Sequence, residues 1–172
     1  EEVKGQFKLR ITGPNRGPTY HLNWDAPNPK LRAAFRDKRV RIALSHGVNR
    51  EEMNQIVFHG LLEPSGYSFG PLSPYFSEEA YHRYVDYDPE RSRALLDDAG
   101  YVDRDGDGYR EFHDGSVFEM TIDFVHPGGM FNGGPVSELL TDHWKDIGVK
   151  VHLNGGLRDI IVPRRYNNEF EV

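Results

Sequence analysis

The sequence predicts an α/β domain in which helices flank a mostly parallel or mixed sheet. Short stretches alternate apolar and polar residues, which is typical of half-buried strands. Longer stretches repeat apolar residues at helical spacing. The two patterns take turns along the chain, so helices are expected to cross between strands. No linker or internal repeat divides the 172 residues, and we therefore expect residues 1–172 to form a single domain.

Period-two alternation of apolar and polar residues predicts four strands. They cover residues 7–11, 20–24, 120–124 and 149–153. A Gly- and Pro-rich turn separates the first two, and residues 25–29, with two prolines, are predicted to be loop. In the third strand, Met120, Ile122 and Phe124 share one face. Each strand is expected to bury one of its two faces.

Capping residues and apolar stripes predict four helices. One begins near Asp37, and the next begins at Asn49, where Glu52 three residues later resembles a capping box. Asp88 and Pro89 start another helix, because Asp caps helices and Pro suits the first helical position. The fourth carries a stripe of apolar residues over 136–147. Between the second and third helices, residues 63–75 are predicted to be an ordered loop.

Composition excludes several classes of function. The chain has no cysteine, which removes disulfides, thiol catalysis, zinc–thiolate sites and iron–sulfur clusters. Its net charge of −6 argues against a general nucleic-acid binder, which needs a basic face. No apolar run approaches the roughly 20 residues of a membrane-spanning helix.

One basic stretch stands out against the negative net charge. It comprises Arg32, Arg36, Lys38, Arg39 and Arg41. These side chains could contact phosphate, but they lie at a helix start, where the macrodipole does not favour cations. A solvated and salt-bridged helix face is therefore the favoured interpretation.

One acidic segment has the spacing of a calcium loop. Asp103, Asp105 and Asp107 occupy loop positions 1, 3 and 5, Gly108 occupies position 6, and Asp114 occupies position 12. Calcium takes six to eight oxygen ligands, which such a turn can bring together. However, position 12 is usually a bidentate Glu, and a strand rather than a helix follows. The favoured alternative is a tight turn in which the Asp side chains accept hydrogen bonds from their own backbone.

Catalytic motifs are absent from the sequence. It contains no nucleophile elbow, phosphate-binding loop or metalloprotease motif, and adjacent acids on helices are usually solvated. Several aromatic residues fall in loops or at strand ends: Trp24, Tyr67, Phe69, Tyr75 and Phe76. As a group they suit stacking on sugars or on peptide side chains, or else they pack the loops onto the core.

Taken in order, several blocks resemble family 5 extracellular solute-binding proteins, the peptide, nickel and oligosaccharide receptors of ATP-binding-cassette importers. The blocks are residues 22–24 (LNW), 35–45 (FRDKRVRIALS), 48–54 (VNREEMN), 58–64 (FHGLLEP), 87–101 (YDPERSRALLDDAGY), 105–110 (DGDGYR), 114–115 (DG) and 144–151 (WKDIGVKV). The family often has Ile-Asp-Arg where this chain has Val48-Asn49-Arg50, but Asn also caps a helix.

The resemblance implies a two-lobed periplasmic-binding-protein fold that closes on its ligand. The chain would then be much of the second lobe, with the first lobe absent. It implies peptide or oligosaccharide ligands, a membrane permease as partner, a monomer, no enzymatic activity and no cofactor. It also implies a periplasmic or extracellular location, with a lipid anchor as an option for the full-length protein.

Site residues follow from the same resemblance. Asn23 and Trp24 end a strand that points toward the cleft in this family, and Tyr67, Ser68, Phe69 and His126 are further candidates for hydrogen bonding and stacking. Two rival functions remain open. One is a calcium-stabilised structural or adhesion domain that uses Asp103, Asp105, Asp107 and Asp114. The other is a carbohydrate-active enzyme with paired acids.

Overall fold

The computed structural model describes residues 18–66, 69–127 and 133–172, and it confirms the predicted α/β class. The elements, in chain order, are α1 (Pro29–Arg36), α2 (Lys38–His46), α3 (Arg50–Phe58), α4 (Glu78–Tyr81), α5 (Pro89–Asp98), β1 (Glu119–Val125), α6 (Gly133–Asp146), β2 (Lys150–Gly156) and α7 (Arg158–Tyr166). Among the described helices, none is long and apolar enough to cross a membrane. The predicted strand at 7–11 lies outside the described residues.

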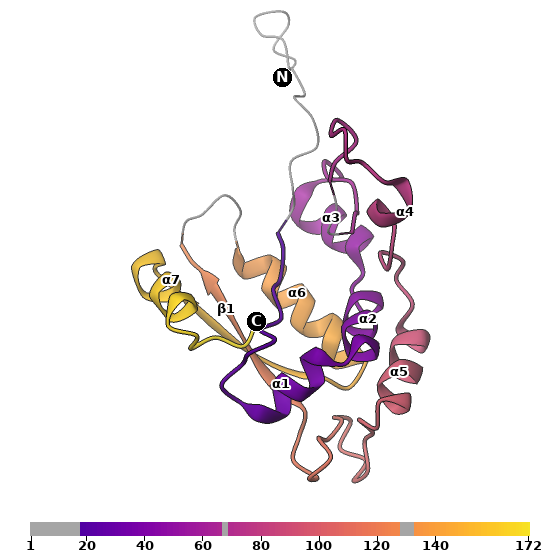
Figure 1. Ribbon diagram of the computed structural model, residues 1–172, viewed down its shortest axis with the longest axis vertical. Coiled ribbons are helices and arrows are strands. Elements are labelled where there is room, and N and C mark those ends of the chain that lie inside the picture. The colour runs from indigo at the N-terminus through magenta and orange to yellow at the C-terminus, as the bar shows by residue number, and fades with distance from the viewer. Residues whose placement is uncertain (1–17, 67–68, 128–132) are drawn as a thin grey trace, which may run out of the picture.

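A β–α–β unit forms the centre of the fold (Figure 1). β1 and β2 pair in parallel, from Glu119 opposite Lys150 to Val125 opposite Gly156, and α6 connects them. Both predicted strands and the predicted crossover helix are therefore confirmed. The apolar side chains of β1 face α6, and α7 contacts the opposite face of the sheet.

The core is formed by side chains from α1, α2, α5 and α6 together with those of the sheet, and Met53 of α3 joins it. Its largest fully buried side chains are Phe35, Phe118, Leu31, Leu96, Met120, Ile122, Leu140 and Ile147. Trp144 on α6 joins two layers directly, because its indole Nε1 donates to the carbonyl oxygen of Leu44 on α2 at 2.9 Å. α2 in turn packs on α5.

The predicted helix starts at Asp37, Asn49 and Asp88 are all confirmed. Each of these three side chains accepts a hydrogen bond from a backbone N–H in the first turn of its helix, at 2.8–3.1 Å. Such a bond satisfies one of the donors that a helix start leaves without an intrahelical partner.

The predicted strand at 20–24 is wrong. This segment is irregular, and within the described residues one backbone hydrogen bond joins it to the C-terminal segment, from the Asn23 N–H to the Glu171 carbonyl at 2.9 Å. The alternation reflects packing on helices instead. Tyr20, for example, is half-buried and hydrogen bonds through its hydroxyl to Ser137 on α6 at 3.0 Å.

The loop predicted at 25–29 ends one residue too late, because Pro29 already begins α1. Asn28 caps this helix by accepting from the N–H of Lys30 at 3.0 Å. The pair Asn28–Pro29 is the same kind of start signal as Asp88–Pro89. The short helices α4 and α7 were not predicted from the sequence either.

Replacing Asp37 with Ala should lower the unfolding free energy by about 1 kcal/mol at pH 7, because the cap of α2 is lost. A hydrogen bond from the Arg39 guanidinium holds the pKa of Asp37 below its ordinary value. A carboxyl with a lowered folded pKa stabilises the protein above its unfolded pKa, and this contribution disappears as the pH falls through the folded pKa. Asp37→Asn keeps a capping oxygen but not the charge. The difference in unfolding free energy between wild type and this variant should therefore shrink from pH 7 to pH 3 in urea titrations. A difference in unfolding free energy that does not change with pH would contradict the lowered pKa of Asp37.

Candidate functional site

A pocket of about 600 Å³ opens beside α6 and brings together segments that are far apart in the sequence. Its walls come from residues 18–22, from α2 and α3, from the loop at 62–66 and from the stretch around α4. Volumes of this size are typical of sites for small ligands. The pocket is therefore the candidate binding site in the described part of the chain.

The inner wall of the pocket is apolar. It is formed by Leu44, Val48, Met53, Leu140 and Trp144. Trp144 is almost completely buried, and its indole N–H is already engaged by Leu44, so it offers the pocket its ring and no free donor. Tyr20 closes one side. Burial raises the pKa of its hydroxyl, and the hydrogen bond with Ser137 opposes part of that shift.

The pocket lining also holds four cationic side chains. The lining includes Lys38, Arg41, Arg50 and Arg83, with Glu63 as its carboxylate. Arg41 donates to the carbonyl oxygens of Phe35 at 2.7 Å and Arg36 at 2.8 Å. These bonds fix its guanidinium, which lies 4.5 Å from the ring centroid of Trp24.

The sequence-based interpretation of the basic stretch is correct for only part of it. Arg36 forms an ion pair with Asp25 at 2.5 Å, and Arg39 pairs with Asp37 and Asp98 at 2.7 and 2.9 Å. These side chains form the predicted salt-bridged face. Lys38 and Arg41 instead line the pocket, which the sequence analysis missed. Their position three residues apart on α2 was the available signal.

Asn23, a predicted ligand-binding residue, has its side chain committed within the fold. Its amide nitrogen donates to the side chain of Asn168 at 2.8 Å and to the carbonyl of Phe170 at 2.9 Å, while its oxygen accepts from the N–H of Asp25. Asn23 is buried and ties the chain near residue 23 to the C-terminal segment. Its role in ligand binding remains a prediction.

The other predicted contact residues lie in different places. Trp24 is 54% exposed and stacks on Arg41 at the pocket wall. Phe69 is also exposed, packs on Tyr75 at 5.6 Å between ring centroids, and adjoins a glycine that lines the pocket. His126 is exposed at the end of β1 and is not part of the pocket lining. Tyr67 and Ser68 lie outside the described residues.

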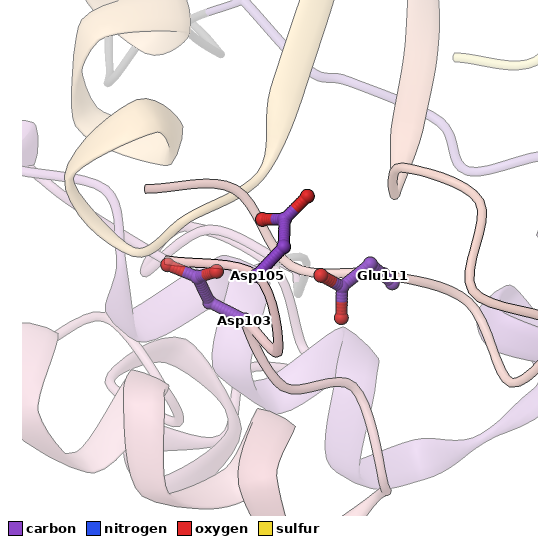
Figure 2. A group of neighbouring side chains, drawn as sticks. All are labelled: Asp103, Asp105 and Glu111. Carbon is purple, nitrogen blue, oxygen red and sulfur yellow. The ribbon is translucent and has the colours of Figure 1, made fainter. Parts of the chain in front are cut away.

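The acidic turn brings together a different set of carboxylates from the predicted one. Asp103 and Asp105 approach Glu111, with one oxygen of each within 4.8 Å of the others (Figure 2). Asp114, predicted at position 12, instead forms an ion pair with Lys30 at 2.6 Å, which lowers its pKa. Asp107 accepts from the N–H of Tyr109 at 2.7 Å. Two of the four predicted ligands therefore share the cluster.

These carboxylates already have donors within the protein. Asp103 accepts from the backbone N–H groups of Gly106 at 2.7 Å and Gly108 at 3.0 Å. Both glycines have positive φ, at 79° and 92°, as the tight-turn alternative predicts. Buried Glu111 accepts from the backbone N–H and the guanidinium of Arg104 at 2.9 and 3.1 Å. The local bonding is thus that of a self-capped turn.

Comparison with known proteins identifies the family. The model of bacterial extracellular solute-binding proteins, family 5 middle, matches residues 2–172. The chain belongs to this family. Family 5 proteins are extracellular or periplasmic binding proteins, and the family assignment made from the sequence blocks is confirmed.

Named relatives of this family 5 chain bind different solutes. It is 28% identical over 142 residues to the oligopeptide-binding protein OppA of Lactococcus lactis subsp. lactis, a match that covers 80% of this chain and 23% of the relative. It is 23% identical over 163 residues to the nickel-binding periplasmic protein of Escherichia coli (strain K12), covering 91% of this chain and 30% of the relative. The chain thus spans about a quarter of the length of such relatives.

Solved structures confirm the fold. A structure of an oligopeptide-binding protein OppA superimposes with a TM-score of 0.81 at 37% identity, covering 87% of this chain and 23% of that one. A mannohexaose-bound periplasmic oligopeptide-binding protein from Thermotoga maritima gives 0.64 at 20% identity, covering 77% and 25%. The family 5 chain therefore has the fold of a lobe of periplasmic binding proteins.

Proposed function

We propose that this chain is part of a solute receptor of an ATP-binding-cassette importer, which captures a peptide or an oligosaccharide between two lobes and delivers it to a membrane permease. The single observation that carries the proposal is the pocket beside α6, which has a volume of about 600 Å³ in a chain of this family. Relatives named for oligopeptide binding, and a related structure with bound mannohexaose, support the two ligand classes.

The pocket favours binding over catalysis. Acid–base cleavage of a glycosidic bond uses two carboxyl groups that flank the substrate. The lining of this pocket, within the described residues, has Glu63 as its one carboxylate. Its apolar inner wall and fixed arginines suit recognition, so we propose a receptor rather than a carbohydrate-active enzyme.

The partner and location follow from the same proposal. A receptor of this kind works outside the cytoplasmic membrane, as a monomer, and hands its ligand to the permease after the lobes open. Ligand binding between lobes buries more of the ligand than one lobe can bury alone, so the complete receptor should bind much more tightly than this chain.

Calorimetric titration of the complete receptor with a pentapeptide and with mannohexaose tests the proposal. We expect one of the two to bind. Trp24→Ala should then weaken that binding by about 1–3 kcal/mol, because Trp24 offers an exposed aromatic face next to Arg41.

Tyr166→Ala is the matched control, since Tyr166 is an exposed aromatic residue on α7 that does not line the pocket. It should leave the affinity unchanged. Unchanged affinity in Trp24→Ala would remove Trp24 from the site, and a receptor that binds neither compound would contradict both proposed ligand classes.

A further inference from the structure

One wall of the pocket is a strap, residues 62–66, that has no helix or strand structure. All of its residues line the pocket beside α6. Within the described part of the chain, residues 63–65 make no hydrogen bond. A loop without hydrogen bonds of its own samples many conformations unless its ends are fixed. The shape of this wall therefore depends on what holds residues 62 and 66.

Asn54 on α3 holds the first end of the strap. Its side-chain amide nitrogen donates to the carbonyl oxygen of Leu62 at 2.7 Å, and its side-chain oxygen accepts from the N–H of Leu62 at 3.0 Å. Asn54 is 7% exposed, so little water can compete for these bonds. One buried side chain thus satisfies both backbone polar groups of Leu62.

The backbone of Asn54 also sets the direction of the strap. Its carbonyl oxygen accepts from the N–H groups of His59 and Gly60, the second at 3.0 Å. Both residues have positive φ, at 55° and 72°, which is the usual way for a chain to turn back at the end of a helix. This reversal after α3 brings Leu62 beside Asn54.

Gly66 holds the second end of the strap against α4. Its N–H donates to the carbonyl oxygen of Tyr81 at 2.6 Å. A Cβ at this position would lie 2.9 Å from the carbonyl oxygen of Ala80 and 3.1 Å from that of Arg83. Such a close approach to backbone atoms requires glycine. The strap is therefore fixed at both ends, by an asparagine side chain and by a glycine.

The helix that carries Asn54 is itself fixed to the rest of the fold. Arg50 on α3 donates to the carbonyl oxygen of Ser45 on α2 at 2.8 Å. On another side of α3, the carboxylate of Glu52 lies 2.9 Å from Nε2 of His143 on α6. Asn54 therefore connects the strap to a frame that is anchored on two other helices.

From these contacts we infer that Asn54 is a positioning residue, which keeps the strap in place as a preformed wall and thereby sets how tightly the receptor binds its solute. The inference rests on the proposed receptor function and adds a residue that controls it. A wall that is already ordered does not have to be ordered by the ligand, so binding avoids that entropic cost. If the strap were formed for only a fraction of the time, the apparent affinity would fall by that fraction.

Calorimetric titration of the complete receptor with a pentapeptide and with mannohexaose tests the inference. Asn54→Ala removes both side-chain bonds to Leu62 and should weaken binding of the accepted compound about 10-fold. Asn49→Ala is the matched control, because Asn49 caps the same helix through the N–H of Glu52 and does not line the pocket. It should lower the melting temperature but leave the affinity unchanged. Equal losses of affinity in the two variants would overturn the inference.

Gly66→Ala separates positioning from direct contact with the solute. The added methyl group would press on the carbonyl oxygen of Ala80 and displace the other end of the strap, so it should also weaken binding. Because both substitutions act on one strap, the double variant should lose less affinity than the product of the two single losses. Losses that multiply would mean that Asn54 contacts the solute itself, which would also overturn the inference.

Hydrogen exchange of backbone amides separates a failure of this inference from a failure of the proposed function. In Asn54→Ala, the N–H of Leu62 should exchange about 10-fold faster, whereas N–H groups inside α3, such as that of Val57, should keep their protection. Unchanged exchange at Leu62 would overturn the inference and leave the receptor function intact. If neither compound binds the wild-type receptor, the proposed function fails, and the exchange rate of Leu62 alone decides whether Asn54 holds the strap.

Discussion

Replacing Trp144 with Ala should lower the free energy of unfolding by about 3–5 kcal/mol, the range for truncating a large buried aromatic residue. Trp144 is 3% exposed, and its indole N–H donates to the carbonyl oxygen of Leu44 on α2. Its removal leaves a cavity and also deprives the buried Leu44 carbonyl of its donor. Urea unfolding followed by far-ultraviolet circular dichroism measures the loss without depending on tryptophan fluorescence.

Trp24→Ala is the natural control, because Trp24 is 54% exposed and its main contact is the stacked Arg41. Loss of that cation–π contact should cost no more than about 1 kcal/mol. The two substitutions should thus have different effects: Trp144→Ala should lower stability, and Trp24→Ala should weaken ligand binding. A loss below about 1 kcal/mol in Trp144→Ala would contradict the close packing of the Trp144 side chain in the core.

Replacing Arg110 with Met should cost about 3–5 kcal/mol, because it leaves the buried carbonyl oxygens of Ile147 and Tyr101 without their donor. Arg110 is 6% exposed. Its Nε–H donates to the Ile147 carbonyl at 2.8 Å, and its Nη1 donates to the Tyr101 carbonyl and to Asp97. One side chain therefore joins the end of α5 to the turn between α6 and β2. Thermal and urea unfolding at pH 7 would measure the effect.

Asp97→Asn provides the comparison, since the Asp97 side chain is 56% exposed and its ion pair with Arg110 is partly solvated. This variant should lose less than about 1 kcal/mol. If it lost as much as Arg110→Met, the ion pair rather than the buried carbonyl contacts would hold the junction. Gly148 belongs to the same arrangement, because it has a φ of 82° and a Cβ there would lie 3.0 Å from the Cγ of Arg110.

Local signals explain why much of the fold could be predicted. The start of α5 is visible in two adjacent residues, Asp88 and Pro89, and α6 in a stripe of apolar residues. The same logic failed for residues 20–24. Their alternation is real, but a strand exists only when a partner backbone lies alongside, and Asn23 finds one such bond, to Glu171. Helix α7 gave no signal, because Pro163 lies inside it and no side chain caps it.

The candidate site could be predicted much less well. Loop aromatics pointed to Trp24 and Phe69, which lie beside the pocket or next to its lining. The sequence did not reveal that Arg39 pairs with Asp98, 59 residues away, while Arg41 forms no ion pair within the described residues and donates to backbone carbonyl oxygens instead. Nor did it reveal that Lys30 pairs with Asp114, which leaves Glu111 beside Asp103 and Asp105.

The sequence by itself determined the helix starts, the β–α–β unit and the family, because each depends on residues that are close together along the chain or on their order. Only the tertiary structure decided which charges are neutralised and which remain free at the pocket. Charge pairing depends on distances of a few ångströms between side chains that are far apart in sequence. Arg36 and Arg39 form ion pairs on the surface, whereas Lys38, Arg41 and Arg50 line the pocket and form no ion pair within the described residues.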